Sequence, residues 1–281
     1  MRGKIRPYLL ILAIPLFFLG CAGDNGDSGT LKVYVTDAKP VLPSGTEQVL
    51  ITFEEVMVHK AGGDWVSLPL VQIPYTINLL QFSGGATTRL VPPVELDSGK
   101  YTQVRIVVTA ASILFSGDPE RYEVEVPSGK LRTDKNFDFD VAGGAAVDLT
   151  VDFDLSQSIV VTGSDRYELK PVLHINETQA AAKIFGEIAA ATFGTATAAV
   201  VVVTWDKDNS GDKGVDDEEY TRLQVEKGIA DPTGFAIFWL VPNQSYIVEV
   251  VVEDTLVYTE TVNATDLIPG ADFELNGGNP I

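Results

Sequence analysis

The segment WDKDNSGDKGVDDEE runs from Trp205 to Glu219 and carries seven carboxylates but only two lysines. Carboxylate oxygens are ligands that hard divalent cations prefer. Calcium loops place oxygen ligands on alternate residues of a twelve-residue loop, with a glycine at the sharp turn in the sixth position. Counted from Asp206, Gly211 takes that turn position. The candidate ligands are Asp206, Asp208, Ser210, Asp212 (through its backbone carbonyl) and Asp217.

A solvated acidic loop is the alternative interpretation of the same segment. Lys213 stands where calcium loops usually have an apolar residue, and Asp217 stands where a longer glutamate usually chelates the ion. The preceding residues VVVVTW predict a strand, so the loop would join two strands and would not belong to a helix-loop-helix motif. If calcium binds there, we expect a structural role and a weak dissociation constant of about 10⁻⁴–10⁻³ M.

Apart from this acidic segment, the sequence contains little evidence for a catalytic or metal site. The two histidines, His59 and His174, are far apart and lack the neighbouring ligands of a zinc site. No nucleophile elbow, phosphate-binding glycine loop or dinucleotide fingerprint is present. The enzymatic hypothesis is therefore a hydrolase with a carboxylate pair, which needs two acids about 5–10 Å apart in a cleft, one of them with a raised pKa.

The acidic and aromatic residues on the predicted strands have structural interpretations that need no functional site. Four aspartates alternate with apolar residues, a pattern that predicts a solvated sheet face. They are Asp138, Asp140, Asp148 and Asp152. Trp65, Phe238 and Trp239 could stack on sugar rings, although large aromatic side chains more often pack in a core. Because Phe238 and Trp239 are adjacent in an expected strand, they point to opposite faces, and one of them could be exposed.

The elements that must position these residues are strands. Apolar residues recur with period two in short segments, turn signals rich in Gly, Asp and Ser separate these segments, and helical periodicity is absent. This pattern predicts an all-β protein built of β-sandwiches. The clearest segments are LKVYVT, RYEVEV, FDFDV and VDLTVDFD, followed by KIFGEI, AAVVVVTW, TRLQV, FAIFWL, YIVEVVV and LVYTETV.

A boundary between two domains is predicted at ETQAAAK, residues 177–183, which has no alternating pattern. The predicted domains are a β-sandwich over 31–176 and a second one over 183–276, which contains the acidic loop 206–219. The net charge of −19 argues against nucleic acid as a partner, because binding to phosphates requires a basic surface.

The N-terminus resembles a bacterial lipoprotein signal peptide. Three basic residues precede an apolar stretch that is too short to span a bilayer, and the only cysteine follows it in the box Phe18-Leu19-Gly20-Cys21. The resemblance implies cleavage of residues 1–20 and lipidation of Cys21, which would anchor the chain stably to a membrane. Residues 21–30 are predicted to be a flexible tether, and Ala22 after the cysteine favours the outer membrane.

Two further resemblances cover the rest of the chain. The segments GTLKVYVTDAKP, EVMVHKAGGDWVSL, INLLQF, LDSGKYTQVRIVV, VPSG and VDFDLSQSIVVTGSDRYELKPVLHI occur in the order found in the bacterial family of the domain of unknown function DUF4382. This resemblance spans about residues 29–176 and implies an exported β-sandwich without assigned activity. The segment GFAIFWLVPNQSYIVEVVVED resembles the carboxypeptidase regulatory-like group, whose domains have a transthyretin-like or carbohydrate-binding-like sandwich fold.

The sequence thus favours a non-enzymatic lipoprotein of the cell envelope, with a glycan or another envelope protein as its ligand and calcium as a stabilising ion. Exposed aromatic residues beside a groove would favour a glycan, whereas a large flat apolar patch would favour a protein.

Overall fold

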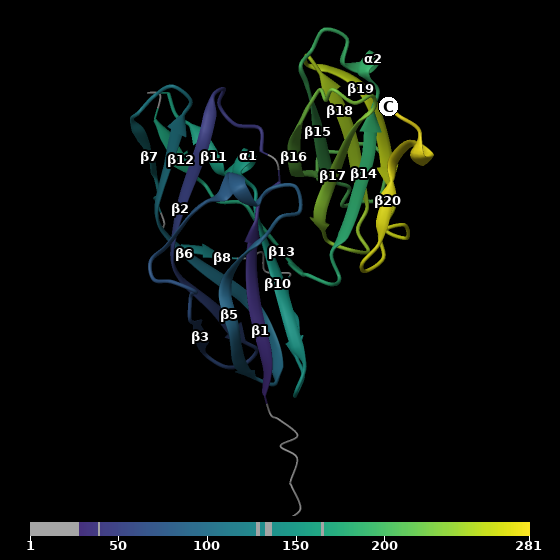
Figure 1. Cartoon of the computed structure of the whole chain (residues 1–281). Coiled ribbons are helices and arrows are strands. Elements are labelled where there is room, and N and C mark those ends of the chain that lie inside the picture. Colours follow the sequence, from purple (N-terminus) through teal and green to yellow (C-terminus); the bar gives the residue numbers. More distant parts are fainter. Residues whose placement is uncertain (1–27, 39, 128–129, 133–136, 164–165) are drawn as a thin grey trace, which may run out of the picture.

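The computed structural model describes residues 28–38, 40–127, 130–132, 137–163 and 166–281. It is built almost entirely of strands, which confirms the predicted all-β fold (Figure 1). Its buried apolar residues form two separate clusters, one from Leu31 to Ile175 and one from Ala182 to Leu275. We call the parts of the chain around these clusters the first domain and the second domain.

The first domain contains a four-stranded sheet of order β13-β10-β1-β5 and a nine-stranded sheet of order β11-β12-β7-β6-β2-β3, in which β4 pairs with β2 while β8 and β9 pair with β6. Its strands are β1 Ser28–Thr36, β2 Thr46–Lys60, β3 Trp65–Leu68, β4 Tyr75–Asn78, β5 Thr88–Asp97, β6 Gly99–Phe115, β7 Arg121–Glu125, β8 Lys130–Arg132, β9 Phe139–Val141, β10 Ala146–Phe153, β11 Ile159–Val161, β12 Tyr167–Leu169 and β13 Leu173–Glu177. Two short helical turns are η1 Leu79–Phe82 and α1 Leu155–Ser158.

The second domain is a sandwich of a three-stranded sheet, β17-β14-β20, and a four-stranded sheet, β16-β15-β18-β19. Its strands are β14 Ala182–Ile188, β15 Ala198–Trp205, β16 Glu218–Glu226, β17 Thr233–Leu240, β18 Tyr246–Val252, β19 Thr255–Val262 and β20 Asp272–Glu274, and its helical turns are α2 Ala190–Phe193 and η2 Leu275–Gly278. β16 and β17 lie on the side of this domain that faces the first domain (Figure 1).

The period-two pattern of β1 explains its place in the first core. Leu31, Val33 and Val35 are fully buried, whereas Lys32 and Tyr34 between them are only half-buried. Alternate side chains of a strand point to opposite faces, so the apolar set packs between the two sheets. β1 pairs in parallel with β10 and antiparallel with β5, which places the start of the described chain at the centre of its sheet.

The predicted tether is too long at its C-terminal end. It was expected to extend to residue 30, but β1 begins at Ser28, Gly29 pairs with Leu96, and the Thr30 N–H donates to the Ala145 carbonyl. These ladder bonds draw the three residues into the sheet. The predicted signal peptide, Cys21 and the rest of the tether lie outside the described residues. No helix in the described ranges is long and apolar enough to cross a membrane.

The outer face of the β13-β10-β1 sheet is the docking surface for the second domain. Thr36, Asp152 and His174 stand in one row of this face, because Asp152 pairs with Thr36 on one side and with His174 on the other. The prediction that Asp152 lies on a solvated face is therefore wrong, since its side chain is 2% exposed. Alternation identified the face correctly, but it could not show that a second domain covers it.

Candidate functional site

The acidic loop joins β15 to β16, as the sequence predicts. Three of its carboxylates come together, because one oxygen from each of Asp206, Asp208 and Asp217 lies within 4.8 Å of the others. These residues hold the first, third and last positions of the predicted calcium loop. Oxygen atoms at this spacing are a suitable start for a calcium coordination shell, which takes 6–8 oxygen ligands.

Backbone hydrogen bonds turn these carboxylates inward. Asp206 is 1% exposed and accepts hydrogen bonds from the N–H groups of Ser210 at 3.1 Å and Gly211 at 2.9 Å. Asp217 accepts from the N–H groups of Lys207 at 2.9 Å and Gly214 at 2.7 Å. The loop therefore holds the three acids together with its own backbone, and each carboxylate has further lone pairs for an ion.

The other two predicted ligands do not join this group. The Ser210 hydroxyl donates to the Asp212 carbonyl at 2.8 Å, and the Asp212 side chain is exposed. Hydrogen bonding by Ser210, whose backbone N–H donates to Asp208 Oδ1 at 3.0 Å, lowers the pKa of Asp208, so this carboxyl is ionised at neutral pH. The loop thus offers a three-carboxylate cluster, which is smaller than the full set that the sequence suggested.

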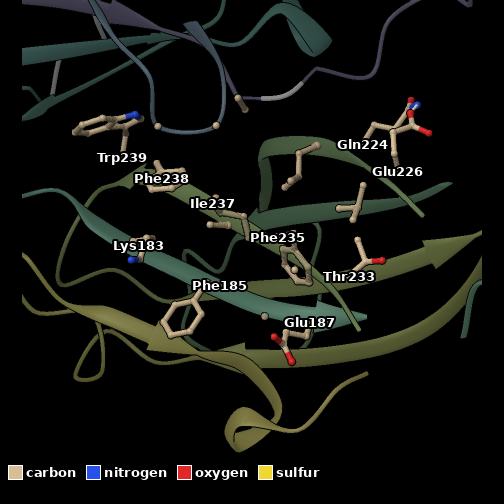
Figure 2. Close-up of a pocket in the computed structure, with 18 of the residues that line it drawn as sticks. Lys183, Phe185, Glu187, Gln224, Glu226, Thr233, Phe235, Ile237, Phe238 and Trp239 are labelled. Carbon is tan, nitrogen blue, oxygen red and sulfur yellow. Dashed lines mark hydrogen bonds between the residues drawn. The ribbon is translucent and has the colours of Figure 1, made fainter. Parts of the chain in front are cut away.

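A cleft of about 620 Å³ between the two domains is a second candidate site, and the sequence did not reveal it. One wall comes from the ends of β1 and β10 and from the loop after η1, and the other from the outer face of β14 and β17 and from the edge of β16 (Figure 2). The first domain contributes Asp37, Ala38, Gly84, Gly85 and Asp152, and the second contributes Lys183, Phe185, Glu187, Gln224, Glu226, Thr233, Phe235, Ile237, Phe238, Trp239 and Glu274, among others.

Two half-buried phenylalanines flank a lysine on the second-domain wall. The Lys183 ammonium lies 5.2 Å from the ring centroid of Phe185 and 5.9 Å from that of Phe238. Lys183 is also paired with Asp272 on the neighbouring strand β20, at 2.7 Å. Figure 2 shows Lys183 and Phe185 on β14 and Phe238 on β17. We call Lys183, Phe185 and Phe238 the aromatic shelf.

A β-bulge in β17 gives the shelf its shape. The register with β14 shifts between the pairs Ala182–Leu240 and Ile184–Ile237, so Phe238 and Trp239 together oppose Lys183. Trp239 has a φ of +64°, a left-handed conformation that is costly for a bulky residue. Its carbonyl accepts hydrogen bonds from Asn176 Nδ2 of the first domain and from the Tyr220 hydroxyl, at 3.3 Å for the latter. Each domain therefore donates one hydrogen bond to the carbonyl of this strained residue.

Glycine on the opposite wall allows the shelf to approach the first domain closely. A Cβ atom on Gly85 would lie 2.9 Å from Phe238 Cε1, a distance that real Cβ contacts do not reach. Phe238 is therefore half-buried against the loop after η1, while Phe185 is flanked by Glu274, its neighbour across the β14–β20 ladder.

Three buried acids lie where β1 and β10 meet the second domain. Asp37, Asp152 and Asp154 are 1%, 2% and 0% exposed. Burial, reinforced by the nearby charge of Asp154, raises the pKa of Asp152 to about 8. Burial and the charge of Asp152 also raise the pKa of Asp37 well above its usual value. Asp154 caps α1, because its carboxylate accepts from the backbone N–H and the side-chain amide of Gln157, both at 2.9 Å.

The domain junction beside the cleft centres on Tyr220. Its carbonyl accepts hydrogen bonds from Gln157 Nε2 at 2.9 Å and from His174 Nε2 at 2.7 Å, and the Ser156 hydroxyl donates to the carbonyl of Arg222 at 3.3 Å. Side chains of the first domain thus satisfy backbone carbonyls on the free edge of β16, which fixes the edge strand next to the cleft.

The remaining residues considered in the sequence lie elsewhere. His59 contacts Thr102 Oγ1 at 3.2 Å and lies beside Trp65, whose indole is covered by the guanidinium of Arg105 at 3.9 Å. The histidines serve packing and docking in the described structure and form no joint site. Of the three proposed sugar-stacking residues, only Phe238 and Trp239 line the cleft. Phe185 and Lys183 were missed, although KIFGEI places Lys183, Phe185 and Glu187 on one face of a strand.

Comparison with known proteins identifies part of the chain. Residues 28–171 match the model of the family described as a domain of unknown function, DUF4382. This match lies within two residues of the start of the predicted resemblance and confirms it, whereas the carboxypeptidase regulatory-like resemblance of the second domain stays a prediction. No curated protein matches the chain.

Three solved structures show distant similarity. The TIE protein of Bacillus anthracis is 10% identical with a TM-score of 0.22, and the alignment covers 88% of this chain but only 33% of that one. A proposed cell adhesion protein of Bacteroides ovatus is 10% identical with a TM-score of 0.23, covering 90% and 92% of the two chains. The fimbrial anchor protein Mfa2 of Porphyromonas gingivalis is 8% identical with a TM-score of 0.20, covering 87% and 89%. Similarity at this level carries no conclusion about ligand or activity.

Proposed function

The chain belongs to the DUF4382 family, and we propose that it is a non-enzymatic binding module of the bacterial cell envelope that holds a glycan in the cleft between its two domains. The observation that carries this proposal is the aromatic shelf, in which the half-buried rings of Phe185 and Phe238 flank Lys183 on the sheet face that lines the cleft. Aromatic rings beside a groove, rather than a wide flat apolar surface, favour a sugar over a protein partner.

The chemistry around the shelf matches what a sugar presents. A pyranose ring offers an apolar face of C–H groups, which an aromatic ring can cover, and a rim of hydroxyls, which need donors and acceptors. Gln224, Glu226 and Glu274 line the same cleft and supply such groups. The cleft volume of about 620 Å³ falls in the range of small-ligand sites, about 300–1,000 Å³. A short oligosaccharide is therefore a ligand of suitable size and chemistry.

Attachment to a membrane is the second part of the proposal. Cys21 would carry lipid and tether the domains to the cell envelope, with the outer membrane as the favoured location. β1 begins seven positions after this cysteine, at Ser28, so the tether would be short and the folded domains would stay near the membrane surface. Another envelope protein is the alternative ligand, and nucleic acid is disfavoured by the net charge of −19.

Calcium is the proposed stabilising ion of the acidic loop. Asp206, Asp208 and Asp217 would supply the first ligands, and an ion among them would relieve the repulsion of three clustered carboxylates. The loop is connected to the sandwich, since the Thr261 hydroxyl donates to the Gly211 carbonyl at 2.9 Å and the Ser245 hydroxyl donates to Asn209 Oδ1 at 2.7 Å. Ordering of the loop would therefore stabilise the edge of the second domain.

A panel of envelope glycan fragments, titrated into the purified protein by calorimetry, tests the proposal. We expect at least one fragment to bind, and we expect Phe185→Ala and Phe238→Ala to weaken it by about tenfold each, the scale of 1.4 kcal/mol. Tyr122→Ala is the matched control, because Tyr122 is an exposed aromatic residue of the first domain outside the cleft. Equal losses in all three variants, or no binding of any fragment, would speak against the aromatic shelf as a sugar site.

The hydrolase hypothesis has one observation in its favour. Asp37 and Asp152 both line the cleft, and burial raises the pKa of each, whereas a carboxylate pair in a hydrolase requires one raised pKa and one ionised partner. Against it, both side chains are almost completely enclosed, so a glycosidic bond has no access to them in this arrangement. Release of reducing ends from the same glycan panel, abolished by Asp152→Asn, would establish the hydrolase in place of the binding module.

A further inference from the structure

The exposed charge in the cleft between the domains is negative. Glu187, Glu226 and Glu274 line the cleft with exposed side chains, whereas Lys183 is the single cation among the described residues that line it. Lys183 is paired with Asp272 at 2.7 Å, so its charge is compensated within the second domain. An anionic ligand would therefore be repelled in this cleft, and a cationic ligand would be attracted.

Two of these carboxylates flank the ring of Phe185. Glu274 stands beside Phe185 in the parallel ladder of β14 and β20, and Glu187 follows Phe185 by two positions along β14, on the same face (Figure 2). Paired residues on neighbouring strands are about 4.8 Å apart, and alternate residues of one strand are about 7 Å apart. Both carboxylates are therefore within reach of a group that lies on the ring.

Neither carboxylate is engaged elsewhere in the part of the chain that the structure describes. The ion pairs of the second domain use other acids, and no hydrogen bond joins the side chain of Glu187 or Glu274 to another described group. Lys39, the residue after Ala38 of the opposite wall, lies outside the described residues. Two exposed carboxylates beside an aromatic ring thus remain available to a ligand.

Small residues border the other side of the Phe185 ring. On β17, Ala236 pairs with Phe185 and Gly234 pairs with Glu187, and both small residues line the cleft. A methyl group and a hydrogen atom are the neighbouring side chains on this side. They leave space on the sheet face next to the half-buried ring, where a ligand can contact the ring and the carboxylates together.

A ring flanked by carboxylates has the chemistry that recognises an ammonium group. The face of an aromatic ring attracts a cation, and a carboxylate accepts charge-assisted hydrogen bonds from it. The shelf already contains one such contact, since the Lys183 ammonium lies 5.2 Å from the centroid of the Phe185 ring. Lys183 precedes Phe185 on β14 and Glu187 follows it, so the side of the ring near Glu187 is not occupied by this lysine.

We propose that the cleft recognises a sugar with a free amino group, whose ammonium lies between Phe185, Glu187 and Glu274. This inference rests on the proposed function and names the class of glycan. In an unacetylated amino sugar, one pyranose carries both an apolar face for an aromatic ring and a cation for the carboxylates. A neutral sugar lacks the charge, and a uronic acid has the opposite charge.

Calorimetry with two oligosaccharides that differ only at the amine tests this inference. Tetramers of β-1,4-linked glucosamine and of N-acetylglucosamine share one backbone, and only the first is a cation at about pH 6. We expect the glucosamine tetramer to bind roughly five- to thirtyfold tighter, through the cation–π contact and the ion pairs. This preference should decrease as the salt concentration is raised, because salt screens the ion pairs.

The two tetramers also separate this inference from the proposed function. Equal or tighter binding of the acetylated tetramer would overturn the preference for a free amine and leave the glycan-binding module standing. Binding of neither tetramer would overturn the preference as well, while the panel of envelope glycans decides the proposed function independently.

Substitutions at the two carboxylates locate the amine. Glu187→Gln and Glu274→Gln remove one charge each from exposed positions, and we expect each to reduce the preference by up to about fivefold, the scale of an accessible ion pair. The double variant should lose the preference and retain its affinity for the acetylated tetramer. Glu47→Gln is the matched control, because Glu47 is an exposed acid of the first domain outside the cleft. A double variant that keeps the preference, or a Glu47→Gln variant that loses it, would overturn the inference.

Tetralysine distinguishes an amino sugar from a cation of any kind. It carries ammonium groups but has no pyranose ring to cover an aromatic side chain. We expect it to bind at least about tenfold more weakly than the glucosamine tetramer, because the contact between ring and sugar face is missing. Tetralysine that binds as tightly would show that a cationic peptide satisfies the cleft, and it would overturn the assignment to an amino sugar.

Discussion

The imidazole ring of His174 stacks on the phenol ring of Tyr220 across the domain junction, with ring centroids 3.9 Å apart and an angle of 23° between the planes. The same histidine donates from Nε2 to the Tyr220 carbonyl at 2.7 Å. One side chain of the first domain therefore holds both the ring and the backbone of an edge strand in the second. This contact sets the position of β16, which forms part of the cleft wall.

Removal of this contact should weaken the folded protein in two separable steps. We expect His174→Phe, which keeps a ring but loses the hydrogen bond, to lower the free energy of unfolding by about 1 kcal/mol. His174→Ala should cost about 1–3 kcal/mol, because stacking is lost as well. Denaturant titration of both variants measures the difference. An alanine variant as stable as the phenylalanine variant would show that the stacking contributes nothing.

Gly29 is a position where the sheet leaves no space for a side chain. A Cβ atom there would lie 2.6 Å from the Ala142 carbonyl oxygen and 2.8 Å from Val141 Cγ1. We expect Gly29→Ala to destabilise the protein by about 1–3 kcal/mol, the usual cost of overpacking. Thermal unfolding measures this, with Gly163→Ala as the control because a Cβ at Gly163 meets nothing within 4 Å. Equal melting temperatures for the two variants would contradict the close approach.

The buried acids predict an unusual dependence of stability on pH. The pKa of Asp152 is about 8 in the folded protein, against about 3.9 in an unfolded chain, so the folded state binds the proton more tightly. This stabilisation is complete below pH of about 4 and is lost as the pH rises towards 8. In the presence of a chelator, the free energy of unfolding should fall by up to about 1.4 kcal/mol per pH unit in that window for each such group.

Asp152→Asn should flatten this pH dependence, since an amide does not titrate. Asp148→Asn should leave it in place, because Asp148 is half-buried and paired with Lys32. Urea unfolding at several pH values compares the two. A wild-type protein whose stability rises between pH 5 and 8 would contradict the buried, protonated state of the pair.

Calcium in the acidic loop should also be measurable as stability. At a calcium concentration about ten times the dissociation constant, an ion bound only to the folded state adds about 1.4 kcal/mol. We expect Asp206→Ala/Asp208→Ala to lose this share of the calcium-dependent rise in melting temperature. Asp212→Ala should retain it, because the Asp212 carboxylate lies outside the three-carboxylate group. If Asp212→Ala lost as much, a general effect of acidic charge, and not the cluster, would explain the result.

The sequence was sufficient for the strands and for the family, and insufficient for the cleft. The alternation of Leu31, Val33 and Val35 identified a strand because burial between two sheets imposes a period of two on any sequence. The same rule correctly placed Asp152 on the outer face of its sheet. It also led to the prediction that the side chain is solvated, whereas the side chain is buried. A second domain covers that face, and local pattern contains no information about which surfaces dock on each other.

The acidic loop and the aromatic shelf show the same limit on a smaller scale. The ligands of the loop are close in sequence, so their spacing alone brought Asp206, Asp208 and Asp217 into consideration together. The shelf joins Phe185 to Phe238, which lie on strands far apart in the chain and meet only through the β14–β17 ladder and its bulge. Trp239, the other residue of that bulge, has a left-handed backbone, and its carbonyl accepts hydrogen bonds from both domains.

The most direct test of the account is the fluorescence of Trp239 while a glycan is added. The chain has three tryptophans, so Trp65→Phe and Trp205→Phe leave Trp239 as the only one, at the edge of the cleft. We predict a saturable change in its emission at the same glycan concentrations that produce heat in calorimetry, and we predict that Phe185→Ala weakens both signals together. A glycan that binds with full heat but leaves the Trp239 emission unchanged, and that binds Phe185→Ala equally well, would place the ligand outside the cleft.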